Sequence, residues 1–571
     1  MSAWADRITR HFHPKLASLL SEGYSLADLR ADGVGGLTVA IVALPLAMAL
    51  AVASGADPGT GLITAIIAGF LVSALGGSRF QIGGPTGAFI PIVYAIIVAY
   101  GYDGLVLATL MAGVILVIAG LLRVGTLMKY LPQPLITGFT AGIAVIIFAS
   151  QIKDLLGLQT PMLPAEFLPK LAAIGRHLDS FNPWALGMAL ACVGIIVGAR
   201  RIAPTAPGFL FAVVIASVST ALLGLPVDTI GTRFGGIPSD LPSITLPAFD
   251  LARMVKLLPA AFTIAFLAGI ESLLSAVVAD GMTGRRHRSN TELIAQGIAN
   301  TGSALFGGLP ATGAIARTAT NIRAGGRTPV AGMLHALFLL GFVLWASGLA
   351  SYVPMPALAG VLLVVAWNMS EHGHFRHTLR SAPGGDKLVL VLTFLLTVFV
   401  DLTVAIEVGM VVAAFAFMHR MAQMVEVTSG VRLVEDQDEA GDDDADQREH
   451  LPAGVEVFQV SGPLFFGAAN RLDNLIDQFH SRPRVFILRM RLVPFIDASG
   501  VHALNGLAER CHRLGIALVL SGMQPQPLAV SRRMRLLERE GELHLAPDYA
   551  GAQALAASII AATPVPAPGN G

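Results

Sequence analysis

The chain has 571 residues, of which 54% are hydrophobic and only 13% are charged. Soluble domains carry about 25% charged residues, so a chain this long with so few charges places most of its surface in lipid. The 38 basic and 38 acidic side chains cancel, which argues against a nucleic-acid partner. The composition therefore predicts an integral membrane protein.

The N-terminal segment 1–33 has no signal-peptide cleavage pattern, and we expect it to be cytoplasmic. The first spanning helix is predicted to begin near Val34. A span needs about 20 apolar residues, and clear candidates lie at 34–54, 59–76, 104–122, 132–152, 183–199, 208–225, 257–279, 330–349, 356–368, 387–401 and 403–419. Three weaker segments, rich in Gly and Pro, lie at 85–100, 291–306 and 312–325. Together they predict fourteen spans.

The basic residues of the short loops test this count, because cytoplasmic loops are enriched in Lys and Arg. With the N-terminus inside, every second loop carries them. The inside loops hold Arg79, then Arg123 and Lys129, Arg200 and Arg201, Arg285, Arg286 and Arg288, Arg317, Arg323 and Arg327, Arg376 and Arg380, and Arg420. The pattern predicts a transmembrane transport domain over 34–427 with both termini in the cytoplasm.

The apolar pattern ends near Val427, and an acidic linker is expected over 428–451. The region 452–562 alternates strand and helix patterns, which predicts an α/β domain. Paired strands are expected within 455–467, further strands at 485–490 and 516–523, and helices at 468–479, 501–515, 527–540 and 549–561. The residues 563–571 have the composition of a disordered tail.

Two glycine-rich motifs recur in the two halves of the membrane region, GGPTGA at 83–88 and GGLPATGA at 307–314. Each lies in a weak, interrupted segment, as expected for discontinuous helices in an inverted-repeat transporter. A half-helix that begins inside the membrane exposes free N–H groups and the positive end of its dipole. Two such ends favour an anion, and Thr86 and Thr312 would add hydroxyl donors. The alternative is that these glycines only permit tight helix packing.

Glu271 has apolar residues on both sides, and an acidic residue inside a membrane is functional by default. Ser275 follows one helical turn later on the same face. We interpret the pair as a site for a coupling proton or cation, with a helix–helix hydrogen bond as the alternative. Arg317 follows the second motif and would add positive charge to the anion site, unless it only marks the inner end of a span.

The sequence gives little evidence for catalysis, a cofactor, a metal site or disulfides. There is no Walker motif, dinucleotide fingerprint or nucleophile elbow, so we expect neither an enzyme nor a bound cofactor. The cluster His372, His374 and His377 is interpreted as part of a polar loop rather than as a metal site. Cys192 and Cys511 lie in different environments and predict no disulfide framework.

The two motifs, ESLLSAVVADGMTG at 271–284 and PFIDASG at 494–500 resemble the bacterial branch of the SulP/SLC26 anion transporters. The resemblance covers about residues 25–560. It implies an α-helical membrane protein of 14 TM helices arranged as two inverted seven-helix repeats, divided into core and gate domains, plus a cytoplasmic α/β STAS domain at 452–562. It also implies a homodimer in the bacterial inner membrane and an elevator-like mechanism.

The same resemblance suggests where the anion binds, between the two half-helices. The substrate-binding positions it implies are Leu46, Leu50, Thr86, Gly87, Thr312, Gly313, Ala314 and Arg317. Sulfate-type members that resemble the first span carry Gln where this chain has Leu46. Sodium-coupled bicarbonate members carry Asp and Thr where this chain has Glu271 and Ser275, whereas the Glu resembles proton-coupled members.

These features favour proton symport of a bicarbonate-, sulfate- or dicarboxylate-like anion. Sodium-coupled bicarbonate symport, anion exchange and an anion channel stay open as alternatives. A nucleobase–cation symporter would lack the C-terminal domain. A membrane-anchored signalling protein, in which the STAS domain acts on a cytoplasmic protein partner, would need neither Glu271 nor the paired glycine-rich breaks.

Ser499 stands in the DxSG turn of the C-terminal domain. The resemblance to anti-sigma-factor antagonists suggests that it is a regulatory phosphorylation site, because a helix start favours added negative charge. The alternative is that Ser499 only caps the helix that follows.

Overall fold

The computed structural model describes residues 12–126, 131–203, 207–237, 250–429, 452–466, 482–536 and 543–562, together with 239, 244, 247, 472 and 476. Most of the predicted acidic linker, most of the predicted helix 468–479 and the predicted tail 563–571 lie outside these described residues. The chain divides into two compact units, Met1–Ala413 and Ala414–Gly571, and the division falls inside one helix.

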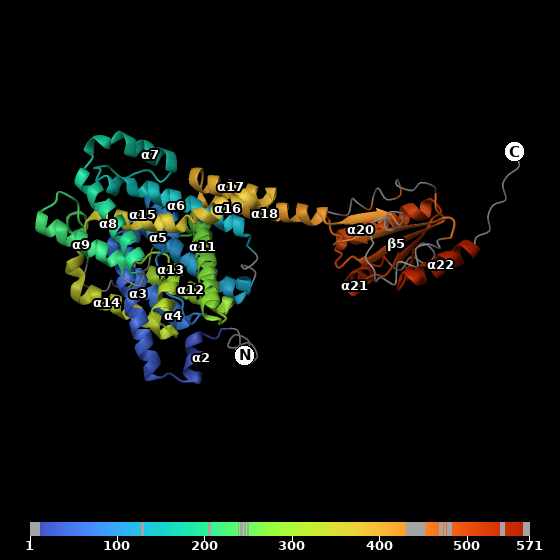
Figure 1. Ribbon diagram of the computed structural model, residues 1–571, viewed down its shortest axis with the longest axis horizontal. Coiled ribbons are helices and arrows are strands. Elements are labelled where there is room, and N and C mark those ends of the chain that lie inside the picture. Colours follow the sequence, from blue (N-terminus) through green and yellow to red (C-terminus); the bar gives the residue numbers. More distant parts are fainter. Residues whose placement is uncertain are drawn as a thin grey trace. The chain divides into compact units, whose positions relative to one another are not determined.

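The first unit consists almost entirely of helices (Figure 1). Its long helices are α3 (Leu26–Ala53), α4 (Pro58–Leu75), α5 (Ile90–Leu121), α6 (Gln133–Leu155), α8 (Pro183–Ile202), α9 (Gly208–Leu223), α11 (Leu251–Thr283), α12 (Ser289–Leu305), α14 (Pro329–Ala350), α15 (Met355–Met369), α17 (Gly384–Phe399) and α18 (Leu402–Gln423). Shorter helices are α2 (Lys15–Glu22), η1 (Gly87–Phe89), η2 (Val124–Thr126), α7 (Phe167–Arg176), η4 (Leu178–Ser180), α10 (Ile230–Phe234), α13 (Ile315–Arg323) and α16 (His372–Ser381).

Every predicted span coincides with a helix or with part of one. The segments 85–100 and 104–122 form η1 and the two halves of α5, which are separated at Gly101, where φ is +72°. A glycine adopts this left-handed conformation without steric cost. The helix that contains the first predicted span begins at Leu26, eight residues before Val34, because Ser25 and Asp28 form a capping box there.

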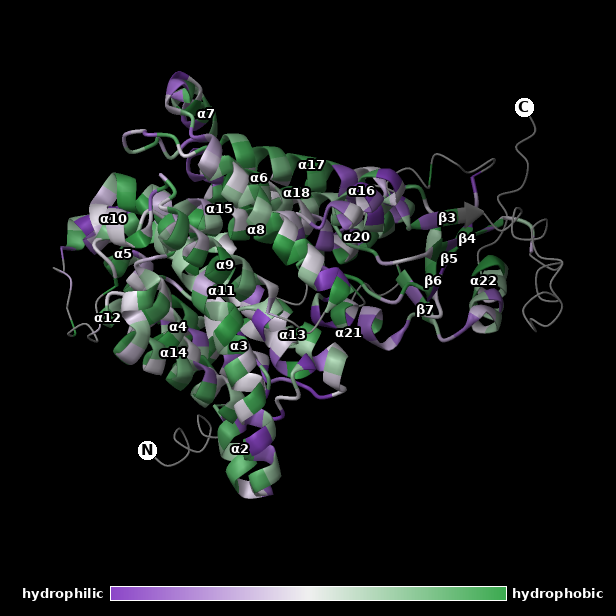
Figure 2. Cartoon of the chain, turned by 60° about the vertical axis from the view of Figure 1, so that its left-hand side comes forward, coloured by the Kyte–Doolittle hydropathy of each residue, from purple (hydrophilic) through white to green (hydrophobic). Residues whose placement is uncertain are grey.

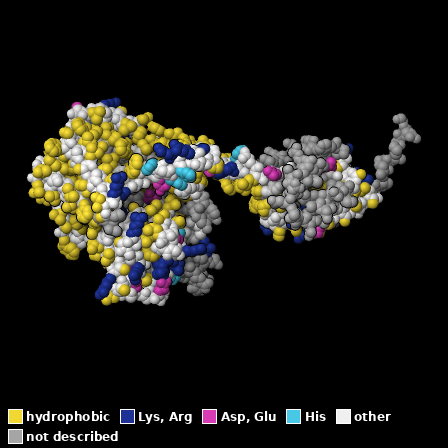
Figure 3. Space-filling view, viewed as in Figure 1, with side chains coloured by type: hydrophobic (Ala, Val, Ile, Leu, Met, Phe, Trp, Pro, Cys, Tyr) yellow, Lys and Arg dark blue, Asp and Glu magenta, His cyan; other side chains and the backbone are white. Residues whose placement is uncertain are grey.

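Eight of the described helices are long and apolar enough to cross a membrane by themselves: α3, α4, η1 with α5, α6, α8, α11, α14 and α18. Large apolar side chains such as Leu222 (80% exposed) and Trp345 (87% exposed) point outward, and hydrophobic side chains cover much of the visible face of this unit (Figure 3). Such a surface is stable in lipid and not in water. The crossing of the shorter helices, and hence the total of fourteen, stays a prediction.

The helices pack in two groups that lie side by side in both views (Figures 1 and 2). One group contains α3, α4, α5, α11, α12, α13 and α14, and the other contains α6, α8, α9, α15, α17 and α18. Each group combines helices from the first and the second half of the membrane region, as the inverted repeat requires.

The second unit contains a five-stranded sheet of order β3-β4-β5-β6-β7. Its elements are β3 (Glu426–Ser429), β4 (Val455–Ser461), β5 (Val485–Leu492), α20 (Ala498–Arg513), β6 (Ala517–Ser521), α21 (Pro525–Arg533), β7 (Leu543–Ala546) and α22 (Tyr549–Ala562). The strands β4 to β7 are parallel, and β3 is antiparallel to β4. Alternate strand residues face different helices, for example Leu488 toward α20 and Ile487 toward α22. The sheet is therefore covered on both faces, as parallel sheets require.

Three details of this unit correct the sequence interpretation. The predicted pair of strands within 455–467 is a single strand, β4, followed by Leu464, which forms an isolated parallel bridge with Ile496. The antiparallel partner of β4 is instead β3, which lies in residues predicted to end the membrane region and begin the linker. The strand β7 was not predicted, because it is only four residues long and only one of its side chains, that of Ala546, is buried.

A buried carboxylate holds the start of the first span in place. Asp32 is fully buried and accepts hydrogen bonds from the amides of Arg327 (2.7 Å) and Thr328 (3.0 Å). It also accepts hydrogen bonds from the hydroxyls of Thr328 (2.5 Å) and Tyr24 (3.1 Å). It therefore joins α3 to the turn that begins α14.

We predict that Asp32→Ala lowers the thermal unfolding midpoint of the purified protein. Each buried amide left without a partner costs about 1–3 kcal/mol. The exposed carboxylate of Asp103 has no hydrogen bond to a described residue, so Asp103→Ala is the matched control and should leave the midpoint unchanged. Equal midpoints for both variants would show that Asp32 does not hold α3 and α14 together.

Candidate functional site

The two glycine-rich motifs meet in the middle of the helical unit. Gly83–Gly84 (β1) and Thr312–Gly313 (β2) form a short antiparallel pair, with Gly83 opposite Gly313 and Gly84 opposite Thr312. The amide of Ala314 extends the pairing by donating to the carbonyl of Ile82 at 2.9 Å. The sequence predicted two interrupted helices, and the structure brings both interruptions to one point.

A helix starts directly after each of these strands. Thr86 precedes η1 and α5, Ala314 precedes α13, and neither start has a side-chain cap. The first N–H groups of a helix have no intrahelical acceptor. Because the amide of Ala314 is bonded to Ile82, the free donors of α13 are those of the residues that follow it. Two uncapped, positive helix ends therefore lie next to each other, which is the electrostatics of an anion site.

A carboxylate lies beside the first of these helix starts. The hydroxyl of Thr86 donates a hydrogen bond of 2.8 Å to Oε2 of Glu271, which lies on α11. Both side chains are partly accessible, although most of their neighbours in sequence are buried. The second oxygen, Oε1, has no hydrogen bond to a described residue, so it is free to bind a proton or a cation.

Two of the predicted site residues, Ser275 and Thr312, form hydrogen bonds with groups outside the predicted site. The hydroxyl of Ser275 donates to Oγ1 of Thr318 at 3.1 Å, and Thr318 also accepts the amide of Ile82 at 3.1 Å. The hydroxyl of Thr312 donates to the carbonyl of Ala268 at 2.9 Å. Both side chains are fully buried. The partner of Glu271 in this structure is therefore Thr86 and not Ser275, and Thr312 holds β2 against α11.

Arg317 is only 2% exposed, and none of its three guanidinium nitrogens has a hydrogen-bond partner among the described residues. The side chain packs against β1, because a Cβ added to Gly84 would lie only 2.0 Å from a guanidinium nitrogen. Gly84 also has φ of +151°, a conformation open to glycine. A buried charge without a partner is costly, so this guanidinium favours a negatively charged ligand nearby.

The apolar wall of the site comes from both groups of helices. A Cβ added to Gly87 would lie 3.2 Å from Ile147 of α6, 3.4 Å from the sulfur of Met369 in α15 and 3.9 Å from Leu50 of α3. Gly87 therefore lies where the two groups meet. Leu46 is partly buried, one helical turn before Leu50 on the same face of α3.

The sequence interpretation missed the buried polar side chains that hold the connection between α4 and β1. Glu292 of α12 accepts hydrogen bonds from the amides of Gly77 (2.8 Å) and Ser78 (3.2 Å) and from the hydroxyl of Ser272 (3.1 Å). The amide group of Gln81 donates to the hydroxyl of Ser272 at 2.6 Å. Glu292 is an acidic residue within a predicted span, so the argument used for Glu271 would have identified it.

The regulatory candidate Ser499 lies on the first turn of α20 and is partly exposed. It does not cap the helix. The cap is Asp497, whose carboxylate accepts the amide of Gly500 at 2.8 Å. The hydroxyl of Ser499 is therefore not the capping group of α20, and its regulatory role stays a prediction.

Comparison with known proteins agrees with this architecture. The model of the sulfate permease family matches residues 29–393, and that of the STAS domain matches residues 450–552. A putative sulfate transporter of Bacillus subtilis, YvdB, is 40% identical over 529 residues, which is 92% of this chain and 97% of the relative. The bicarbonate transporter BicA of Picosynechococcus is 33% identical over 458 residues, 78% of this chain and 80% of the relative.

Solved structures agree with the fold. SLC26A9 superimposes with a TM-score of 0.85 at 19% identity and covers 98% of this chain and 94% of its own. The transmembrane domain of a cyanobacterial BicA gives a TM-score of 0.60 at 31% identity, over 68% of this chain and 98% of its own. From the family match and these relatives, the chain belongs to the sulfate permease (SulP/SLC26) family of anion transporters, with a C-terminal STAS domain.

Proposed function

We propose that this protein is a secondary active symporter that carries a small anion together with a proton. The observation that carries the proposal is the buried guanidinium of Arg317, which has no partner among the described residues, lies against β1 and belongs to the first turn of one of the two uncapped helices. All three groups supply positive charge or hydrogen-bond donors and no acceptor. An anion is the ligand that satisfies all of them at once.

The hydrogen bond between Thr86 and Glu271 suggests how a proton is coupled to that anion. An ionised Glu271 places a negative charge one hydrogen bond away from the first helix start and repels an incoming anion. Protonation of the carboxylate removes this repulsion, so the proton and the anion bind more tightly together than separately. Such mutual stabilisation of two ligands is the thermodynamic requirement for symport.

The names of the relatives support a small anion as the substrate. One is named a sulfate transporter and another a bicarbonate transporter, and we propose a bicarbonate-, sulfate- or dicarboxylate-like anion for this chain. The wall formed by Leu46 and Leu50 supplies no hydrogen-bond donor. A small or weakly hydrated anion therefore suits this wall better than one that needs many donors.

The position of the site suggests the transport motion. Gly87 lies where the two helix groups meet, so a displacement of one group against the other would carry the half-helices past Ile147 and Met369. We propose an elevator-like movement of this kind in a homodimer in the bacterial inner membrane, with both termini in the cytoplasm. We propose that Ser499, on the first turn of α20, is a phosphorylation site through which a cytoplasmic partner regulates transport.

We predict that anion uptake depends on a proton gradient through Glu271. Proteoliposomes with the wild-type protein should accumulate one of bicarbonate, sulfate, succinate or fumarate when an inward proton gradient is applied. Glu271→Gln should accumulate none above the level reached without a gradient, because the amide cannot bind the proton. Glu407→Gln, which changes an exposed carboxylate of α18, is the matched control and should transport like the wild type. Radiolabelled uptake measures all three.

Other outcomes would redirect the proposal. Uptake that follows a sodium gradient would favour sodium coupling, and uptake that ignores both gradients would favour exchange or a channel. If none of these anions moves, the STAS domain becomes the functional part of the protein.

We predict that Arg317 contributes to the affinity for the transported anion. Arg317→Gln should raise KM for the transported anion by about 10- to 100-fold, the effect of losing a charged hydrogen-bond donor. Its thermal unfolding midpoint should be unchanged or higher, because the substitution removes a buried unpaired charge. Arg323→Gln, an exposed position on the same helix, should change neither quantity. A stability loss without a change in KM would assign Arg317 to the fold and not to the anion.

A further inference from the structure

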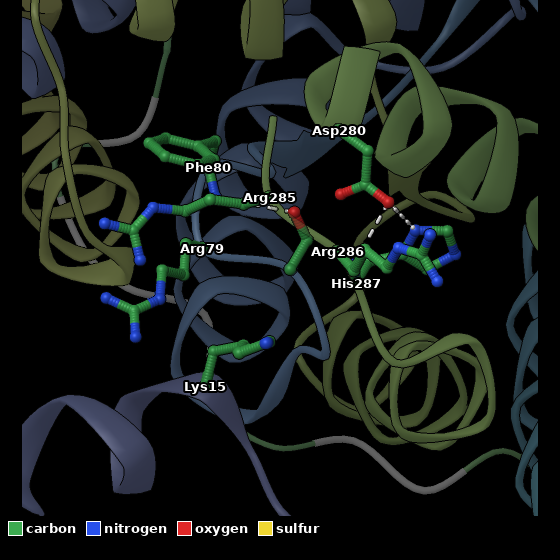
Figure 4. Close-up of a pocket in the computed structure, with 8 residues that line it drawn as sticks. Lys15, Arg79, Phe80, Asp280, Arg285, Arg286 and His287 are labelled. Atoms are coloured by element: carbon green, nitrogen blue, oxygen red, sulfur yellow. Dashed lines mark hydrogen bonds and ion pairs between the residues drawn. The ribbon is translucent and has the colours of Figure 1, made fainter. Parts of the chain in front are cut away.

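A second basic site lies away from the two half-helices. A cavity of about 270 Å³ opens between α2, the turn after α4 and the connection from α11 to α12 (Figure 4). It is lined by Lys15, Ser78, Arg79, Phe80, Asp280, Arg285, Arg286 and His287. Its size is close to the lower end of ligand pockets, which occupy about 300–1,000 Å³.

The acidic groups near this cavity are already paired. The carboxylate of Asp280 bonds to Nδ1 of His287 at 2.7 Å, and that of Glu22 bonds to Arg79. The side chains of Lys15, Arg285 and Arg286 have no hydrogen bond or ion pair to any other described residue. Burial and the neighbouring Arg288 and Arg79 lower the pKa of Lys15. The cavity therefore has an excess of positive charge.

The cavity is built into the fold. The amide of Lys15 donates to the carbonyl of Gly76 at 2.9 Å, which fixes α2 beside the end of α4. The side chain of Arg288 donates to the carbonyl of His13 at 2.6 Å and to the hydroxyl of Ser18 at 3.2 Å. Three segments far apart in the sequence are thus held together around the basic side chains.

Exposed apolar side chains on the helices around the cavity indicate that these helices border lipid. Leu20 on α2 is 75% exposed, and Leu26 at the start of α3 is 66% exposed. Val278 and Met282 are also exposed on the last turns of α11, on the helix face opposite Asp280. In a membrane protein such side chains face acyl chains. The cavity therefore lies on helices that border the membrane, and α2 shows the mixed polar and apolar colouring of a helix at the membrane surface (Figure 2).

We propose that this cavity binds the phosphate group of an anionic phospholipid headgroup. The excess positive charge of the cavity favours a phosphate group, and the exposed apolar side chains of α2, α3 and α11 favour acyl chains nearby. A basic pocket at the cytoplasmic end of membrane helices is a recurring setting for such headgroups. The wall at Ser78–Phe80 continues into β1, so a bound headgroup would contact the same connection that leads to the anion site.

The test measures lipid binding to the full-length protein in detergent by native mass spectrometry. Short-chain phosphatidylglycerol should bind saturably and more tightly than phosphatidylcholine, whose choline cancels the phosphate charge. Arg285→Gln with Arg286→Gln should raise the Kd for phosphatidylglycerol about tenfold or more, and Lys15→Gln should raise it by a smaller factor.

Two controls separate this site from other basic surfaces. Arg376→Gln with Arg380→Gln neutralises an exposed basic pair on α16 and should leave the Kd unchanged. Arg317→Gln alters the proposed transport site and should also leave it unchanged. Equal affinity for the two lipids, or equal weakening by both double variants, would overturn the proposal. Inorganic phosphate that binds alone and displaces the lipid would assign the cavity to a soluble anion instead.

Discussion

The whole membrane unit depends on one constraint, which is that non-helical backbone at membrane depth must find its hydrogen-bond partners within the protein. The segments around Gly83 and Gly313 satisfy each other by forming β1 and β2. Their flanks are held by side chains from neighbouring helices. Asn300 bonds to both backbone groups of Ala311 at 2.8 Å, and Thr64 accepts the amide of Leu309 at 2.7 Å.

This arrangement leaves the N–H groups at the two helix starts unpaired, and these are the donors that an anion requires. The strand pair uses the amides up to Ala314, and the helices that follow begin without side-chain caps. A capping Ser or Asp at either start would compete with a ligand for the same N–H groups. Glycine at position 84 leaves space for the guanidinium of Arg317, and glycine at position 313 leaves space for the amide of Gln81. The same residues therefore serve the fold and the proposed site.

The C-terminal unit is stabilised in a different way, by a sheet that helices bury. Its parallel strands are buried on both faces by helices on either side, and its first strand, β3, is supplied by the chain directly after α18. Ser499 lies at the start of α20, where Asp497 already caps the helix and the dipole favours a negative group.

The sequence by itself determined the membrane class, the position of the helices, the two interrupted segments and the α/β character of the C-terminal domain. These properties follow from local patterns. Long apolar runs, glycine-rich breaks and alternating strand and helix periods each involve residues that are close together in the sequence. Only the tertiary structure decided that Thr86 and not Ser275 bonds to Glu271, that Thr312 faces α11, that β3 joins the sheet and that Glu292 holds the turn before β1. Those contacts join residues far apart in the sequence, and side-chain direction depends on which helices pack together.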